Sequence, residues 1–354
     1  MIPANPLLGT ALHAVGAAFA ALCYTPQKKV IGWSWQSYWL VQAAFCWFLL
    51  PIIGAWLTIP ELGKVLEESP RGPMLTAFAL GAAYGIGGTA FGVSIRYIGF
   101  SLTYAIAIGL STVLGTLIPP LVAGTLGATL SKPGAQWIIG GIVVGMTGIA
   151  FTGAAGRMKE RDLSASASLG GFSLMTGLLL SLLAGVLSAV YGFALAAGEP
   201  IADVATKYGA GVFRGNVVYI FSNTGAFLST AIYCLWLHRK HQTLGEIVEL
   251  PAGTEKASLP VNWAMAVLTG CLWYGQFFFY NLGHVRMGEY EFTSWAIHMI
   301  MLILFSIVVG WLFHEWRDAC SRTKLSVGIA FVVLVGAVLA LTYGNHLAEI
   351  SAPH

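Results

Sequence analysis

The stretch FTSWAIHMIMLILFSIVVGWLFHE, residues Phe292–Glu315, decides the fold class of this chain. It contains no Asp, Glu, Lys or Arg before Glu315. A bilayer has a hydrocarbon core about 30 Å thick, which about 20 helical residues can cross. Lipid cannot satisfy exposed backbone groups, and the stretch lacks the strict alternation of a barrel strand. It therefore predicts a transmembrane helix.

Apolar blocks of the same kind recur along the whole sequence, separated by connections that carry Pro, Gly and charged residues. The other nine are Leu7–Tyr24, Ser34–Ile59, Met74–Ile95, Phe100–Ala123, Gly134–Ala155, Phe172–Ala197, Phe213–Leu237, Asn262–Leu282 and Lys324–Gly344. We expect an all-α membrane protein of about ten transmembrane helices.

The composition excludes a soluble globular protein. Hydrophobic residues make up 57% of the 354 residues and charged residues 9%, whereas a soluble domain carries about 25% charged residues. The net charge of +3 does not indicate a nucleic-acid partner, and the five cysteines form no Cys-x-x-Cys pair, so no metal site is expected. The sequence has no His-Glu-x-x-His, Gly-x-Ser-x-Gly or Walker pattern. We expect no enzyme activity, no catalytic residue and no cofactor, and the bilayer as the surrounding medium.

The distribution of basic residues predicts the orientation. Alternate connections, beginning with Lys28-Lys29 and ending with Arg322 and Lys324, hold twelve of the 18 Lys and Arg residues. Cytoplasmic connections carry the excess of such residues. We therefore expect this side to be cytoplasmic and both termini to be periplasmic. The N-terminus has no basic region, so the first block is expected to be a retained span rather than a signal peptide.

A weak internal echo suggests two related halves. At a constant offset of 190 residues, Tyr84-Gly85 matches Tyr274-Gly275, Arg96 matches Arg286, and Thr103 matches Thr293. Five spans per half would give the halves opposite topology, as in the inverted repeats of many transporters. We predict an N-terminal repeat over residues 1–156, a cytoplasmic connector over 157–171 and a C-terminal repeat over 172–354. Transporters of this kind bind substrate between their repeats.

The stretch WYGQFFFYNLGH, residues Trp273–His284, is the most informative for function. At helical spacing Trp273, Gln276, Tyr280 and His284 fall on one face. Aromatic rings that stack on a sugar, together with amide and phenol groups that bind its hydroxyls, suit a monosaccharide pocket. We predict a substrate site at Trp273, Gln276, Tyr280, Asn281, His298 and Tyr84. The alternative for aromatic residues is simple packing or an interfacial belt.

Ionisable residues near the ninth span are candidates for carrying a proton. Glu289 and Glu291 lie in its leading connection, and His298 lies inside the span. Histidine changes charge near neutral pH, and ionisable groups inside a membrane are often functional. The alternatives are solvated loop charges for the glutamates and a neutral ring, bonded to a backbone carbonyl, for His298. His13 and Glu199 are further candidates.

At these motifs the chain resembles the L-rhamnose–proton symporter family, within the drug/metabolite transporter superfamily. The resemblance extends over nearly the whole chain and is most specific at Trp273-Tyr-x-Gln-Phe-Phe-Phe-Tyr280, Gly283-His-x-Arg286, Ser294-Trp295 and His298. Further matches are Tyr24-x-Pro26-x-Lys28-Lys29, Trp33-Ser-Trp35, Gly85-Ile-Gly87, Arg96-Tyr-x-Gly99, Ala105–Gly109, Lys159-Glu-Arg161 and Glu315-Trp316.

The resemblance implies ten helices in two inverted halves, a bacterial inner membrane, and uptake of a sugar together with protons by alternating access. Gly88 and Ala90 in the third span depart from the asparagines that the resemblance leads us to expect. The expected substrate is therefore L-rhamnose or a related monosaccharide. A small-metabolite exporter or exchanger of the same superfamily is the alternative. A sensor that binds sugar without transporting it is a third reading, which the lack of a soluble domain disfavours.

Overall fold

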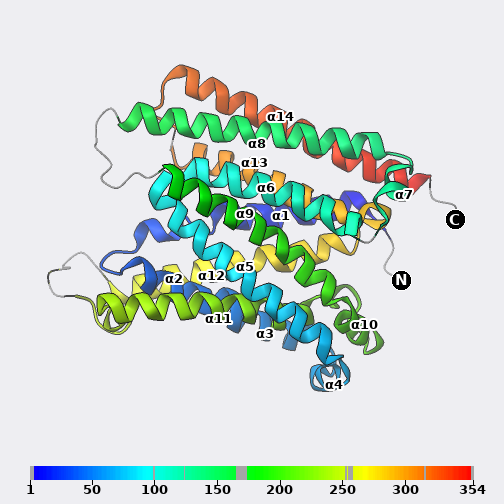
Figure 1. Cartoon of the computed structure of the whole chain (residues 1–354), viewed down its shortest axis with the longest axis horizontal. Helices are drawn as coiled ribbons and strands as arrows, with labels where there is room; N and C mark the ends of the chain where they lie inside the picture. Colours follow the sequence, from blue (N-terminus) through cyan, green and yellow to red (C-terminus); the bar gives the residue numbers. More distant parts are fainter. Residues whose placement is uncertain are drawn as a thin grey trace. The chain divides into compact units, whose positions relative to one another are not determined.

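The computed structural model describes residues 4–98, 100–122, 124–164, 174–251, 253, 258–314 and 316–351, and in these residues helices are the regular structure, without a strand (Figure 1). The helices, with η marking 3₁₀ or π segments, are α1 Pro6–Leu22, η1 Pro26–Lys29, α2 Trp35–Ala43, η2 Ala44–Leu49, α3 Leu50–Thr58, α4 Leu62–Glu68, α5 Arg71–Ile98, α6 Phe100–Val122, α7 Leu126–Leu130, α8 Ala135–Ser164, α9 Leu174–Ala197, α10 Glu199–Lys207, η3 Gly211–Phe213, α11 Asn216–His241, η4 Leu244–Ile247, α12 Leu259–His284, η5 Gly288–Thr293, α13 Ser294–Leu312 and α14 Ser321–Ile350.

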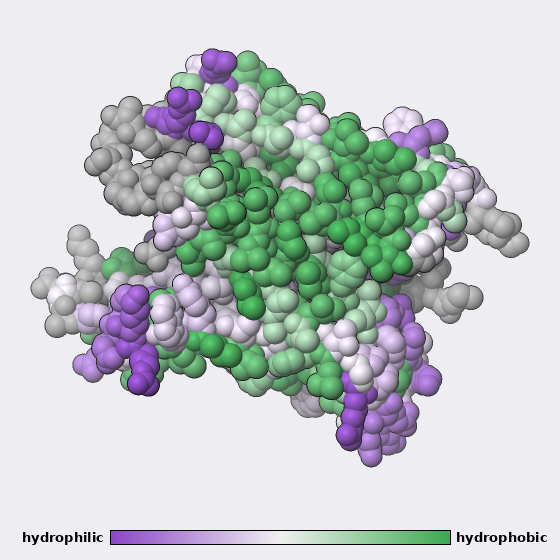
Figure 2. Space-filling model, in the orientation of Figure 1, coloured by the Kyte–Doolittle hydropathy of each residue, from purple (hydrophilic) through white to green (hydrophobic). Residues whose placement is uncertain are grey.

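Within the described residues, nine helical segments are long and apolar enough to cross a membrane. Each of the ten predicted spans coincides with a helix, and the tenth, α12, has 26 residues. Gln276, Asn281 and the aromatic residues of α12 make it less apolar than the other nine. Figure 2 shows hydrophobic residues, in green, along the helices of the visible face and hydrophilic residues, in purple, near helix ends. The chain is an all-α, multi-pass membrane protein.

The chain forms two compact units, and each combines segments from both ends of the sequence. Unit 1 contains Met1–Ala21, Gly87–Gly192 and Phe279–His354, and unit 2 contains Leu22–Ile86 and Phe193–Phe278. The long helices α5, α9 and α12 contribute residues to both units. The division into sequential repeats at residues 1–156 and 172–354 stays a prediction. In the segment predicted as a connector, α8 continues to Ser164, and residues 165–171 lie outside the described ranges.

In unit 1, α8 and α14 pack along each other over most of their length, as the upper part of Figure 1 shows. Glycines on α8 permit this approach. A Cβ atom at Gly141 would stand 2.7 Å from Leu341, and one at Gly148 would stand 2.7 Å from Leu334. Small residues let backbones come close in membranes, where packing rather than hydrophobicity drives helix association. The helix α13 packs against α6, α8 and α14.

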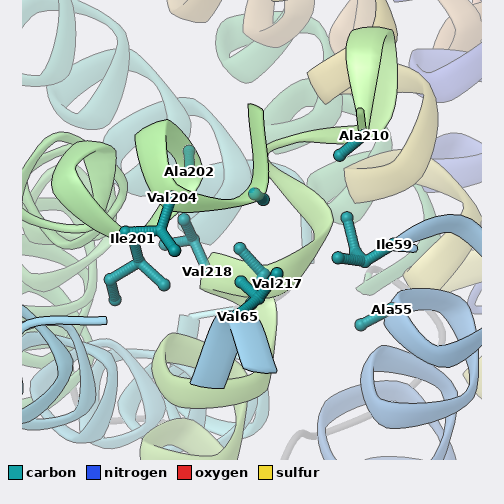
Figure 3. Packing of buried hydrophobic residues seen from close by; sticks show 10 residues of the cluster. Ala55, Ile59, Val65, Ile201, Ala202, Val204, Ala210, Val217 and Val218 are labelled. Atoms are coloured by element: carbon teal, nitrogen blue, oxygen red, sulfur yellow. The ribbon is translucent and has the colours of Figure 1, made fainter. Parts of the chain in front are cut away.

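In unit 2, α11 packs against α2, η2, α3 and α10. One hydrophobic cluster joins the ends of these helices to the short helices α4 and α10, and Figure 3 shows most of its side chains. Its buried members are Ala55, Ile59, Val65, Ile201, Ala202, Val204, Ala205, Ala210, Val217 and Val218. The helices α4 and α10 therefore cover the ends of the membrane spans with an apolar face.

The second predicted span is interrupted by a π-helical segment, η2, where a regular helix was expected. Pro51 follows at the start of α3. Proline has no N–H to donate, and its ring clashes with the carbonyl four residues earlier, here that of Trp47. A wider turn before Pro51 relieves that clash, and π segments of this kind are frequent at functional sites. Pro51 is therefore the feature of the sequence that indicates this π-helical distortion.

The 3₁₀ segment η4 is fastened to the start of α2 by Glu246. The Glu246 carboxylate accepts hydrogen bonds from the Ser34 N–H and the Ser37 hydroxyl, both at 2.7 Å. The Trp33 indole donates to the Glu246 carbonyl at 2.6 Å. Because acceptors that carry a charge make the stronger hydrogen bonds, this clamp fixes where α2 begins. Trp33 and Ser34 belong to the Trp-Ser-Trp motif that the sequence singled out.

Candidate functional site

An aromatic cluster in unit 2 surrounds Trp273 on α12. The ring centroid of Trp273 lies 5.2 Å from that of Trp47, 5.4 Å from Tyr24 and 5.8 Å from Trp39. We call these four residues the tryptophan cluster. Edge-to-face contacts of this kind hold the rings in fixed orientations. Trp273, predicted from sequence, is therefore the centre of a rigid aromatic surface.

Two other predicted substrate residues adjoin this cluster in unit 2. The Tyr84 ring lies 5.8 Å from Trp47 and 6.5 Å from Phe277, measured between centroids. Gln276 is buried, next to Phe277 on α12. Tyr219 donates a hydrogen bond to the Phe277 carbonyl at 2.8 Å, which ties α12 to α11. Trp273, Gln276 and Tyr84 are thus held in one unit, among aromatic neighbours.

Gln42 on α2, one helical turn after Trp39, is a polar residue that the sequence pattern did not indicate. It is 0% exposed, and neither its amide nitrogen nor its amide oxygen has a hydrogen-bond partner among the described residues. The indole nitrogens of Trp39 and Trp47 are likewise buried without a partner there. A buried amide without partners costs about 1–3 kcal/mol. Each such group calls for an explanation, and a ligand that supplies the missing hydrogen bonds is one.

The π segment brings Trp47 onto the face of Trp39. In a regular helix, residues eight apart diverge by about 80° around the axis. The wider turn of η2 removes most of that divergence, and both indoles reach Trp273. A regular α-helix over the second span, as predicted from the sequence, would leave Trp39 and Trp47 on different faces. Pro51 was the one available signal of the distortion.

A second group of polar rings lies in unit 1, at the end of α12. We call His13, Tyr280, His284 and His298 the histidine cluster. The Tyr280 ring lies 5.2 Å from His13, 5.4 Å from His298 and 5.6 Å from His284, measured between centroids. His298 is 2% exposed and His13 is 0% exposed. Tyr280 and His298, both predicted from sequence, are thus brought together with His13.

The predicted acidic residues lie at the edge of this cluster. Glu291 pairs with His284 at 3.1 Å, between Oε1 and Nε2, and the two side chains are 44% and 28% exposed. The side chain of Glu289 lies outside what the structure describes. Asn281 is buried one residue after Tyr280. Glu291 is therefore the predicted acid that contacts the histidine cluster.

Trp295 fixes the position of His298 on α13. Its indole nitrogen donates to the Ser111 carbonyl at 3.1 Å and approaches the Ser111 hydroxyl at 3.3 Å. The Ser111 hydroxyl donates in turn to Ser188 at 3.1 Å. These bonds join α13 to α6 and α9, one turn before His298. A Cβ atom at Gly115 would collide with the Trp295 indole, so glycine makes room for it.

The departures at Gly88 and Ala90 have a partial structural account. Ala90 is buried against Ala107 and Ala184, with Phe91 and Leu180 beside them. An asparagine there would place an amide among methyl groups, without the partners that a buried polar group needs. Position 90 is thus a packing position between α5, α6 and α9.

Similarity to known proteins extends over nearly the whole chain. Residues 3–345 match the family described as L-rhamnose-proton symport protein (RhaT). The chain is 33% identical to the L-rhamnose-proton symporter of Mannheimia succiniciproducens over 351 residues, covering 96% of this chain and 98% of the relative. It is 32% identical to the symporters of the same name from Cronobacter sakazakii, covering 94% of this chain and 97% of the relative, and Pectobacterium atrosepticum, covering 95% and 98%. Similarity along nearly the entire length shows that the chain belongs to the L-rhamnose-proton symport protein family.

Proposed function

We propose that this protein takes up L-rhamnose or a related monosaccharide together with protons across a bacterial inner membrane, by alternating access. Membership of the family over residues 3–345 supports this proposal most strongly. The relatives are named as symporters of L-rhamnose and protons. The excess of Lys and Arg in alternate connections supports a cytoplasmic location for those connections, with both termini periplasmic. No catalytic residue is part of the proposal.

The sugar binds at the tryptophan cluster. Trp273 and Trp47 supply apolar faces on which the C–H groups of a pyranose stack. Gln42 and Gln276 supply amides that can both donate to and accept from sugar hydroxyls. The unpartnered amide of Gln42 supports this assignment, because a bound hydroxyl gives it the hydrogen bonds that the protein does not.

The proton binds in the histidine cluster, where Glu291 and His298 are the groups able to exchange it. Helix α12 carries Trp273 and Gln276 in unit 2 and Tyr280 and His284 in unit 1. One continuous helix therefore connects the sugar-binding residues to the proton-binding residues. Symport requires that each ligand change the affinity for the other, which is a coupling free energy between the two sites. A shift of α12 is the means by which we expect that coupling to act.

The proposal is tested by adding L-rhamnose to de-energised cells that express the protein. Symport predicts alkalinisation of the medium as protons enter with the sugar. A panel of monosaccharides in thermal-shift measurements on purified protein identifies the preferred sugar, since a ligand stabilises the state that it binds. Intact expression with no pH change for any stabilising sugar would contradict proton coupling. Counterflow that needs substrate on both faces, with no net uptake, would instead indicate the exchanger.

Gln276→Ala is expected to weaken sugar binding about tenfold. The change removes hydrogen bonds worth about 1–1.5 kcal/mol, and 1.4 kcal/mol is about a factor of ten in Kd. Titration of purified protein with the stabilising sugar gives the affinity. An unchanged Kd would remove Gln276 from the site.

Gln42→Leu is expected to raise stability and weaken sugar binding at once. The leucine removes an amide that is buried without partners, so the melting temperature without sugar should rise by about 2–4 °C for about 1 kcal/mol. Sugar affinity should fall about tenfold, because a sugar hydroxyl loses its amide.

Gln36→Leu is the matched control on the same helix. Gln36 is also buried, but it donates a hydrogen bond to the Thr243 hydroxyl at 2.8 Å. Its loss should lower the melting temperature and leave the sugar Kd unchanged. If Gln42→Leu lowers the melting temperature as Gln36→Leu does, Gln42 has a structural partner and the assignment is wrong.

A further inference from the structure

Unit 1 contains two deeply buried imidazoles on different helices. His13 lies on α1 and His298 on α13, with ring centroids 5.9 Å apart at an interplanar angle of 73°. Tyr280 on α12 completes a triangle, at 5.2 Å from His13 and 5.4 Å from His298. Three helices that are distant in sequence thus place two bases and a phenol against one another.

Close helix packing fixes His13 in this position. A Cβ atom at Gly283 would stand 3.0 Å from the His13 ring and 2.8 Å from the Gly9 carbonyl oxygen. Glycine at position 283 therefore allows α1 to approach α12 and the imidazole to fit between them.

Three of the four ring nitrogens of the pair lack a hydrogen-bond partner among the described residues. Neither nitrogen of His13 has a partner among the described residues, and Nδ1 of His298 has none there. A neutral imidazole has one donor and one acceptor, so both rings carry unused capacity. Two imidazoles are fewer than the three or four ligands of a zinc site, and no group of three metal-ligating residues occurs in the described part of the chain. The ligand that the pair suits is a proton.

We propose that His13 and His298 form one site, which holds a single proton during the transport cycle. This inference rests on the proposed symport and names its proton carrier. A proton from water binds a lone pair on either ring, and the same proton leaves from that nitrogen on the other side of the membrane. Two imidazolium ions so close together in a buried place repel each other, so the second ring stays neutral. One proton per sugar follows from that exclusion.

Unit 1 contains further titratable groups, and those at the exposed edge of the histidine cluster give the proton access to the pair. Tyr280 and His284 come from α12, Arg286 follows in the turn after α12, and Glu291 comes from η5. The half-exposed Glu291 contacts His284, whose ring stacks on Tyr280 at an interplanar angle of 15°. Arg286 donates to the Leu282 carbonyl at 2.6 Å. On α14, His346 and Glu349 pair with each other at 3.6 Å. The edge formed by Glu291 and His284 is thus the exposed end of the cluster.

Proton uptake on sugar binding tests the inference. Purified protein in weakly buffered detergent solution receives L-rhamnose, or the monosaccharide that stabilises it most, with a pH indicator present. We expect the wild type to take up about one proton per bound sugar. His13→Gln, His298→Gln and the double variant should each take up at least fivefold less. The double variant should be no worse than either single variant, because the two rings act as one site. His346→Gln should behave as the wild type.

The outcomes separate this inference from the proposed function. A wild type that binds sugar without taking up a proton overturns proton coupling itself. A wild type that takes up a proton, with His13→Gln taking up just as much, overturns the shared site and leaves symport standing. If a variant aggregates, the ¹⁵N spectrum of the histidines in the wild type tests the inference instead. Sugar should then produce one additional imidazolium, and none would overturn the inference.

Discussion

Trp273→Ala should weaken sugar binding about hundredfold and abolish measurable uptake. Stacking on the indole buries roughly 60 Å² of apolar sugar surface, worth about 1.5 kcal/mol at about 25 cal/mol/Å². Trp273 is also the common neighbour of Tyr24, Trp39 and Trp47. Its truncation frees their rings to shift, and the two effects together reach about 2.8 kcal/mol, a factor of about a hundred in Kd. Uptake of labelled sugar and titration of purified protein measure the loss.

Trp56→Ala is the matched control for that experiment. Trp56 lies on α3 in the same unit, is 70% exposed and takes no part in the tryptophan cluster. Its loss should leave the sugar Kd within about twofold. An equal loss of sugar affinity in Trp273→Ala and Trp56→Ala would show that removing any tryptophan disturbs the fold. An unchanged Kd for Trp273→Ala would place the sugar elsewhere.

Gly81→Ala should prevent stable folding or lower the melting temperature by roughly 5–10 °C. Gly81 on α5 lies directly against the backbone of α11. An added Cβ atom would overlap the Ser222 carbonyl oxygen and stand 2.6 Å from its carbon. Because backbone cannot rotate aside as a side chain does, the helices must separate, at a cost on the order of 3 kcal/mol. Gly225 on α11 faces the Phe78 carbonyl in the same way, so relaxation on either side is blocked.

Gly72→Ala isolates this packing effect from helix propensity. Gly72 lies on the same helix, and nothing stands within 4 Å of the position that its Cβ atom would take. Alanine is the better helix former, by up to about 1 kcal/mol. Gly72→Ala should therefore leave the melting temperature unchanged or raise it slightly. A Gly81→Ala protein as stable as Gly72→Ala would mean that α5 and α11 do not pack this closely.

The sequence predicted the helices well because bilayer thickness sets their length. Each of the ten apolar blocks coincides with a helix, including the less apolar α12. Prediction was less complete where local geometry departs from a regular helix. The second block contains the π segment η2, because Pro51 disturbs the hydrogen bonding of the turn before it. The short helices α4 and α10 were also absent from the expectation, since segments of 7 and 9 residues are too short to cross a bilayer and lie in the connections between the apolar blocks.

For the site, a single helix face could be predicted, and contacts between distant segments could not. Trp273, Gln276 and Tyr280 share one face of α12, and spacing alone predicts that. The approach of Trp39 and Trp47 to Trp273 depends on how α2 and η2 pack within unit 2. The nearness of His13 to His298 depends on Gly283, whose role appears only once α1 and α12 are placed side by side. The roles of these residues stay predictions, because structure gives their positions and transport measurements give their use.

The two longest helices are too long for the membrane that they cross. At about 1.5 Å per residue, the 30 residues of α8 and of α14 each extend for about 45 Å. A hydrocarbon core is about 30 Å thick, so this pair must tilt or project into the headgroup layer. The Lys159 ammonium lies over the Trp316 ring at 4.8 Å from its centroid, near the end of α8. An ammonium group over an indole ring is typical of the membrane interface. The Lys159–Trp316 contact therefore marks the depth of the interface near the end of α8. A thicker or thinner bilayer would change the tilt of α8 and α14 relative to this depth.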